Sequence, residues 1–130
     1  WGYAALARAP LFGPAVVPAH RGMVVEVPLH LGLMPGAAPA DALRDCLAEF
    51  YAGSKVVRLS TENPDELLLR GSMRPSDRLE LWVYGSRDAS QARLVARLDN
   101  LGKGASGAAV QSLNLMAGLD ETAGLALSDA

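Results

Sequence analysis

Regular alternation of apolar and polar residues predicts a strand near the start of the chain. In 22–31 every second residue is apolar, which is the period of a strand that buries one face. Pro28 has no N–H to donate, so this strand is expected at a sheet edge or at a bulge. Further strands are predicted at 55–59, 79–84 and 91–98. The last two alternate in the same way across a short turn, so we expect them to pair antiparallel.

A repeat of three to four residues predicts two helices. The first covers 41–51, with Pro39 at its start and Gly53 after its end, because glycine tolerates the left-handed conformation of a helix C-cap. One stripe is expected to be buried: Leu43, Cys46, Leu47 and Phe50. The second helix covers about 106–117 and ends at Gly118. Its apolar stripe consists of Val110, Leu113 and Met116.

Strands and helices in this irregular order predict an α+β fold. We expect a largely antiparallel mixed sheet with helices on one face, in a single domain spanning 1–130, because this length encloses one apolar core. Trp82 and Tyr84 fall on the outward side of their strand, where exposed rings are costly. A helix, another domain or a second subunit is therefore expected to cover them. The charged residues between 65 and 78 are expected to form a solvated face.

Composition excludes several classes of function. The net charge is −2 with both signs mixed along the chain, so no positive field attracts nucleic acid or anionic lipid. No apolar run reaches the roughly 20 residues that span a bilayer. From the charge and the apolar runs together, neither nucleic acid nor a membrane is an expected partner. Cys46 is the single cysteine and is expected to be a buried free thiol in a reducing compartment, which indicates the cytoplasm. His20 and His30 lack companion ligands, so no metal site is predicted.

Three glycines make 99–107 the stretch richest in candidate chemistry. Gly102, Gly104 and Gly107 match G-x-G-x-x-G, but a dinucleotide fold also needs a following parallel strand and an acidic residue about 20 positions on. The chain is nearly over here, so we reject a Rossmann interpretation. Two interpretations remain. The glycines let a ligand reach the backbone, with Lys103 adding positive charge, or they only permit a tight turn and close helix packing, which spacing alone favours.

Residues 98–119 read LDNLGKGASGAAVQSLNLMAGL and resemble a family signature. N-acetyl-gamma-glutamyl-phosphate reductases carry, near their end, aspartate-asparagine-leucine, then lysine-glycine-alanine, then alanine-valine-glutamine with asparagine-leucine-methionine. Residues 10–14 (PLFGP) followed by 21–31 resemble the segment entering the second domain of this family, in its shorter bacterial branch. Gly71 and Ser72 with 78–81 are a looser match.

The resemblance implies a glyceraldehyde-phosphate-dehydrogenase-like C-terminal domain, which binds substrate and builds a homo-oligomer, a dimer or a tetramer. It implies that Arg21 lies near the anionic group of an acyl phosphate substrate. Asn100 would lie by the nicotinamide of NADP, with Lys103 and Gly104 lining the same cleft. Helix 104–118 would pack on a nucleotide-binding domain that the chain lacks.

The family reaction needs groups that this chain does not supply. A cysteine thiolate attacks the acyl phosphate, phosphate leaves, and NADPH reduces the thioester, with a histidine as acid and base. The nucleotide fingerprint and the histidine motif are absent, and Cys46 lies mid-helix among predicted core residues, so no catalytic residue is assigned. The chain starts at Trp1 rather than Met. We expect a fragment, inactive alone, of an oxidoreductase that converts N-acetyl-gamma-glutamyl phosphate to N-acetylglutamate semialdehyde in arginine biosynthesis.

Two alternatives stay open. A reductase of the related lysine route, which acts on a carrier-protein-bound aminoadipyl phosphate, shares the features that concern cofactor and fold. The other alternative is a non-catalytic dimerisation or substrate-binding module that exposes apolar surface.

Overall fold

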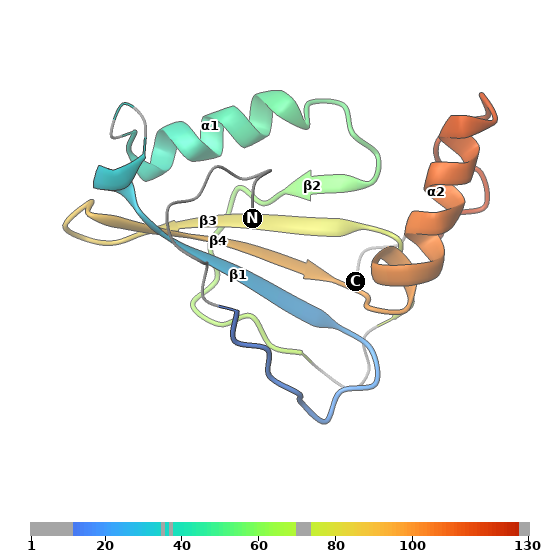
Figure 1. The fold of residues 1–130 in the computed structure, drawn as a ribbon, viewed down its shortest axis with the longest axis horizontal. Helices are drawn as coiled ribbons and strands as arrows, with labels where there is room; N and C mark the ends of the chain where they lie inside the picture. The colour runs from blue at the N-terminus through green and yellow to red at the C-terminus, as the bar shows by residue number, and fades with distance from the viewer. Residues whose placement is uncertain (1–11, 35, 37, 70–73, 128–130) are drawn as a thin grey trace.

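A computed structural model describes residues 12–34, 36, 38–69 and 74–127 (Figure 1). These residues form a four-stranded sheet in the order β1-β4-β3-β2. The strands are β1 (Met23–His30), β2 (Val57–Leu59), β3 (Leu79–Gly85) and β4 (Gln91–Leu98). β4 pairs antiparallel with both β1 and β3, whereas β2 pairs parallel with β3. The predicted α+β fold with a largely antiparallel mixed sheet is confirmed, and β1, which contains Pro28, lies at the sheet edge as predicted.

The register divides the sheet into two chemically different faces. Met23, Leu98 and Leu79 lie opposite one another, as do Val25, Ala96 and Leu81. We call this side the apolar face, and its members on the three longer strands are Met23, Val25, Val27, Leu29, Leu79, Leu81, Val83, Ala92, Leu94, Ala96 and Leu98. The other side, the mixed face, carries Val24, Glu26, Glu80, Trp82, Tyr84, Arg93, Val95 and Arg97.

Helix α1 (Ala40–Phe50) packs on the apolar face along β3 (Figure 1). A Cβ at Gly85 would lie 3.0 Å from the Ala40 Cβ, and the Arg44 guanidinium donates a hydrogen bond to the Val83 carbonyl at 2.8 Å. Gly53 follows the helix with a positive φ of 78°, as predicted for its C-terminal end.

The buried stripe predicted for this helix is wrong in part. Cys46 is exposed, and 78% of Phe50 is accessible to solvent. Leu43 and Leu47 are half-buried. Because α1 contacts chiefly one strand, β3, the side of the helix that carries Cys46 and Phe50 remains outside the packing.

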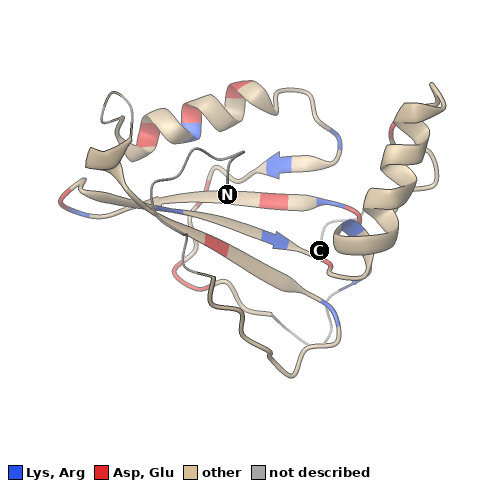
Figure 2. Cartoon of the chain, viewed as in Figure 1, with Lys and Arg blue, Asp and Glu red and all other residues tan. Residues whose placement is uncertain are grey.

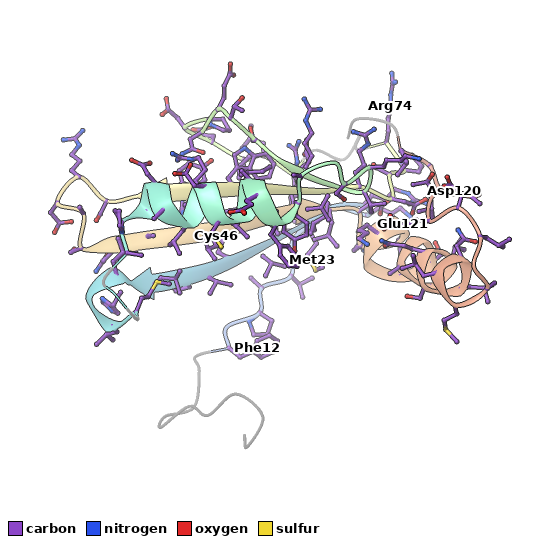
Figure 3. The ribbon with its side chains drawn as sticks, turned by 90° about the horizontal axis from the view of Figure 1, so that it is seen from above. Phe12, Met23, Cys46, Arg74, Asp120 and Glu121 are labelled. Atoms are coloured by element: carbon purple, nitrogen blue, oxygen red, sulfur yellow. The ribbon has the colours of Figure 1, made fainter. Side chains whose placement is uncertain are left out.

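Trp82 and Tyr84 on the mixed face are covered by the chain itself. Trp82 is 4% exposed, and the Tyr84 hydroxyl donates to the Pro64 carbonyl at 3.0 Å. Figures 1 and 3 show the segment 60–69 on the side of the sheet away from α1. The cover predicted from a helix, another domain or a second subunit is therefore replaced by an extended segment that immediately follows β2.

Helix α2 (Gly107–Met116) stands at one end of the sheet (Figure 1). Its main contacts are with one turn of π-helix, Gly102–Ser106, that joins it to β4. The prediction that helices cover one face is thus confirmed for α1 and wrong for α2. Gly118 ends α2 with a positive φ of 68°. The predicted stripe on α2 is exposed, with 62% of Leu113 and 85% of Met116 accessible.

Candidate functional site

Antiparallel pairing of β1 and β4 brings two distant sequence segments together at one end of the sheet. Met23, the first residue of β1, lies opposite Leu98, the last residue of β4. The residues just before β1 therefore meet those just after β4. The Arg21 guanidinium contacts the Asp99 carboxylate at 2.6 Å, and the Gly22 amide donates to the Asn100 side-chain oxygen at 2.8 Å. Two residues predicted for a ligand site, Arg21 and Asn100, thus belong to one hydrogen-bonded cluster.

Asp99 is at the centre of this cluster and is fully buried. Its Oδ1 accepts the Leu101 amide at 2.9 Å, and its Oδ2 accepts both Arg21 and the Ser76 amide, the latter at 3.3 Å. Burial acts to raise the pKa of Asp99, but hydrogen bonds from Leu101, Arg21, Ser76 and Gly102 outweigh it, so the pKa lies below the usual 3.8. The carboxylate is therefore ionised at neutral pH.

The glycines after β4 permit close packing, the interpretation that spacing favoured. A Cβ at Gly107 would lie 2.5 Å from the Asp77 Cγ, and one at Gly102 would clash with the backbone carbonyl oxygen of Ser76. Both contacts are too close for a real side chain, so neither position accepts alanine without movement. Gly104 differs, because it is exposed although its amide donates to the Asp99 carbonyl at 2.9 Å. Of the three glycines, it is the one whose backbone a ligand can reach.

Lys103 is directed toward α2. Its ammonium group donates to the Gln111 side-chain oxygen, and the Gln111 amide donates to a Glu121 carboxylate oxygen at 2.6 Å. The Lys103 backbone amide donates to the Ser76 carbonyl at 3.2 Å. Lys103 therefore links the loop after β4 to α2 and to the segment that follows α2.

A second buried carboxylate, Asp77, anchors the segment after α2. Its amide donates to the Ala126 carbonyl at 2.7 Å, and its Oδ2 accepts the Ala126 amide at 2.7 Å. Asn114 on α2 donates to the carbonyls of Glu121 and Ala123. Asp77 is 9% exposed, so the interpretation of 65–78 as a solvated charged face is wrong at this residue. The sequence pattern does not reveal the burial of Asp77, because its partner Ala126 is 49 positions away.

The other residues considered from the sequence lie outside the cluster. His20 and His30 are exposed, and the described residues contain no group of three or more His, Cys, Asp or Glu side chains that could hold a metal ion. Cys46 is exposed on α1 (Figure 3). The matches at 10–11 and 71–72 fall outside the described residues.

Acidic and basic residues are interspersed over the sheet and α1 (Figure 2). In the part of the chain that the structure describes, no helix has the length and apolar character needed to cross a membrane.

Comparison with known proteins gives a consistent result. The family model described as "Semialdehyde dehydrogenase, dimerisation domain" matches residues 3–100. N-acetyl-gamma-glutamyl-phosphate reductase 2 of Nostoc sp. is 40% identical over 129 residues, which cover 95% of this chain and 40% of that protein. The N-acetyl-gamma-glutamyl-phosphate reductase of Rhizobium leguminosarum bv. trifolii is 43% identical over 114 residues, 85% of this chain and 37% of that protein. That of Brucella ovis is 42% identical over 116 residues, with 87% and 37% covered.

The chain thus spans about two fifths of the length of these curated relatives, and the matched region contains all four strands and extends to Asn100. The chain belongs to the semialdehyde dehydrogenase dimerisation-domain family.

Proposed function

We propose that this chain is the substrate-binding and dimerisation part of an NADP-dependent N-acetyl-gamma-glutamyl-phosphate reductase. The whole enzyme would convert N-acetyl-gamma-glutamyl phosphate to N-acetylglutamate semialdehyde, in the cytoplasm, as a step of arginine biosynthesis. One observation carries the proposal: residues 99–104, which match the reductase signature, form a single cluster with Arg21 at the end of the sheet. Relatives with this reductase name match 95% of the chain.

Arg21 is the substrate-binding residue of the proposal. Its guanidinium offers several N–H donors in one plane, which suits carboxylate or phosphate oxygens. One of these donors contacts Asp99, yet 30% of the side chain is exposed. The part of the guanidinium that does not contact Asp99 is therefore the part offered to the substrate.

Three residues on the other side of the cluster fit contact with NADP. Gly104 has an exposed backbone, Asn100 carries a side-chain NH₂ that donates hydrogen bonds, and Lys103 adds a positive charge. The cofactor supplies the hydride, and we place most of its binding on a nucleotide-binding domain outside this chain. The residues of this chain would orient the substrate and one side of the cofactor, whereas the nucleophilic thiolate would come from a cysteine other than Cys46.

Exposed apolar surface supports two contacts with other parts of the enzyme. Met23, Val25 and Val27 on the apolar face of β1 are 39–46% exposed. We place the second subunit of a homo-oligomer on this face. On α2 the large apolar residues Leu113, Leu115 and Met116 are 59–85% exposed, so we place the nucleotide-binding domain against 104–118. This arrangement corresponds to the glyceraldehyde-phosphate-dehydrogenase-like design.

The experiment is the reverse reaction, phosphate-dependent reduction of NADP by N-acetylglutamate semialdehyde. It is run with protein expressed from the complete gene and with this chain alone. Activity in the first sample and none in the second supports the proposal, and omission of phosphate is the control. A folded, oligomeric product of the complete gene without activity would contradict it and favour the non-catalytic module. Preference for aminoadipate semialdehyde would favour the lysine route.

A further inference from the structure

Asp99 contacts both sides of the candidate site. On one side its Oδ2 accepts Arg21 at 2.6 Å and the Ser76 amide at 3.3 Å. On the other side its Oδ1 accepts the Leu101 amide at 2.9 Å, and its own carbonyl accepts the Gly104 amide at 2.9 Å. One buried residue thus holds the arginine and the glycine loop at the same time.

This arrangement restricts Arg21 more than an exposed ion pair would. A long arginine side chain has many rotamers, and most of that freedom is lost only when a fixed group holds the guanidinium. The Asp99 side chain is fully buried, whereas 30% of the Arg21 side chain is exposed. Asp99 is therefore the fixed partner, and Arg21 is the partner whose direction it sets.

We propose that Asp99 is a positioning residue, which directs the Arg21 guanidinium toward the substrate and holds it in a fixed position relative to the loop Asn100–Gly104. The proposal rests on the proposed reductase function for its substrate. Asp99 itself is too deeply buried to touch a ligand, so its effect on the reaction passes through Arg21.

Asp99→Asn separates the two sides of the residue. The asparagine oxygen can still accept the Leu101 amide in place of Oδ1. Its NH₂ group then takes the position of Oδ2, where it faces two donors, Arg21 and the Ser76 amide. The loop side is thus preserved, while the hold on Arg21 is lost.

The test is steady-state kinetics on protein from the complete gene. We expect Asp99→Asn to raise the KM for the acyl phosphate about tenfold and to change the KM for NADPH less than about twofold. Added to Arg21→Ala, it should raise the substrate KM by less than about twofold more, because a residue that acts through Arg21 has no effect without it. Glu80→Gln is the matched control, since Glu80 is also a poorly exposed carboxylate paired with an arginine, Arg97 at 2.5 Å. It should leave both KM values unchanged.

The outcomes separate the inference from the function on which it rests. Inactive wild-type protein would contradict the proposed function. Active wild type with an unchanged substrate KM in Asp99→Asn, or full additivity with Arg21→Ala, would overturn the inference alone. If Asp99→Asn does not fold, ¹⁵N NMR of the arginine side chains in the unsubstituted chain decides. Resolved Nη signals for Arg21, as expected for a guanidinium held by a carboxylate, support the inference, and rotationally averaged signals refute it.

Discussion

Substitution of Gly107 by alanine tests what the glycines after β4 do. Gly107 is the first residue of α2 and is buried. A Cβ there would lie 2.5 Å from the Asp77 Cγ and 3.0 Å from the Asp77 Cβ. Asp77 has little room to yield, because its Oδ2 accepts the Ala126 amide at 2.7 Å. Relief of the clash therefore requires Asp77 to leave this hydrogen bond or α2 to shift.

The expected cost follows from these contacts. Alanine is intrinsically better than glycine in a helix by at most about 1 kcal/mol. Loss of the hydrogen bond to the Asp77 carboxylate costs about 1.5–3 kcal/mol, and overpacking of a filled site costs about 1–3 kcal/mol. Gly107→Ala should therefore lower the free energy of unfolding by about 1.5–6 kcal/mol in total.

Urea unfolding of this chain, followed by tryptophan fluorescence and by circular dichroism, measures the change. Gly32→Ala is the matched control, because a Cβ at Gly32 meets nothing within 4 Å and no positive φ is involved. It should change stability by less than about 0.5 kcal/mol. Equal stability of the two variants, with weaker NADP binding in Gly107→Ala, would refute the packing argument and restore the interpretation that this glycine admits a ligand.

Four further results are expected. Val25→Asp places a charge on the half-exposed apolar face and should convert an oligomer to monomer in light scattering; an unchanged mass would count against this face as the interface. Asn100→Ala and Lys103→Ala in protein from the complete gene should each lower turnover at least about tenfold, while the circular dichroism spectrum of the folded protein is retained; wild-type kinetics would reject these assignments. Cys46 is exposed and should react with a thiol reagent in the folded chain, and protection until unfolding would show it covered. Because the folded pKa of Asp99 lies below 3.8, the stability it contributes is present above that pH and is lost as pH falls below it. Asp99→Asn should therefore flatten the loss of stability on the acid side of this pH, and parallel acid transitions would contradict this.

The sequence predicts the regular elements well because their signals are local. Residues 91–98 alternate in the pattern of a strand and form β4 with the same bounds. Gly53 and Gly118 follow the two helices with positive φ, as their positions indicate. The exposure of Cys46 and Phe50 cannot be predicted in this way, because α1 has apolar residues on more than one side and periodicity alone does not select the side that packs.

The polar part of the candidate site depends on partners that are distant in sequence. From the sequence alone, Asp77 and Asp99 are expected to be solvated, as most carboxylates are, and only the fold shows that both are buried. Their partners Ala126 and Arg21 lie 49 and 78 positions away. The family signature indicated Asn100 and the loop after it, yet their hydrogen bonds to Gly22 and Asp99 require the pairing of β1 with β4.

The strand order also bears on how the chain reaches its native state. β3 and β4 are joined by the short turn 86–90, whereas β1 reaches β4 from the far end of the sequence. Closure of the longer loop costs more chain entropy and slows folding. We therefore expect the β3–β4 hairpin to form before β1 docks on its open edge. Arg21 and Asp99 meet only at that docking step, so the proposed ligand binding at this end of the sheet would require completed folding and not only collapse of the chain.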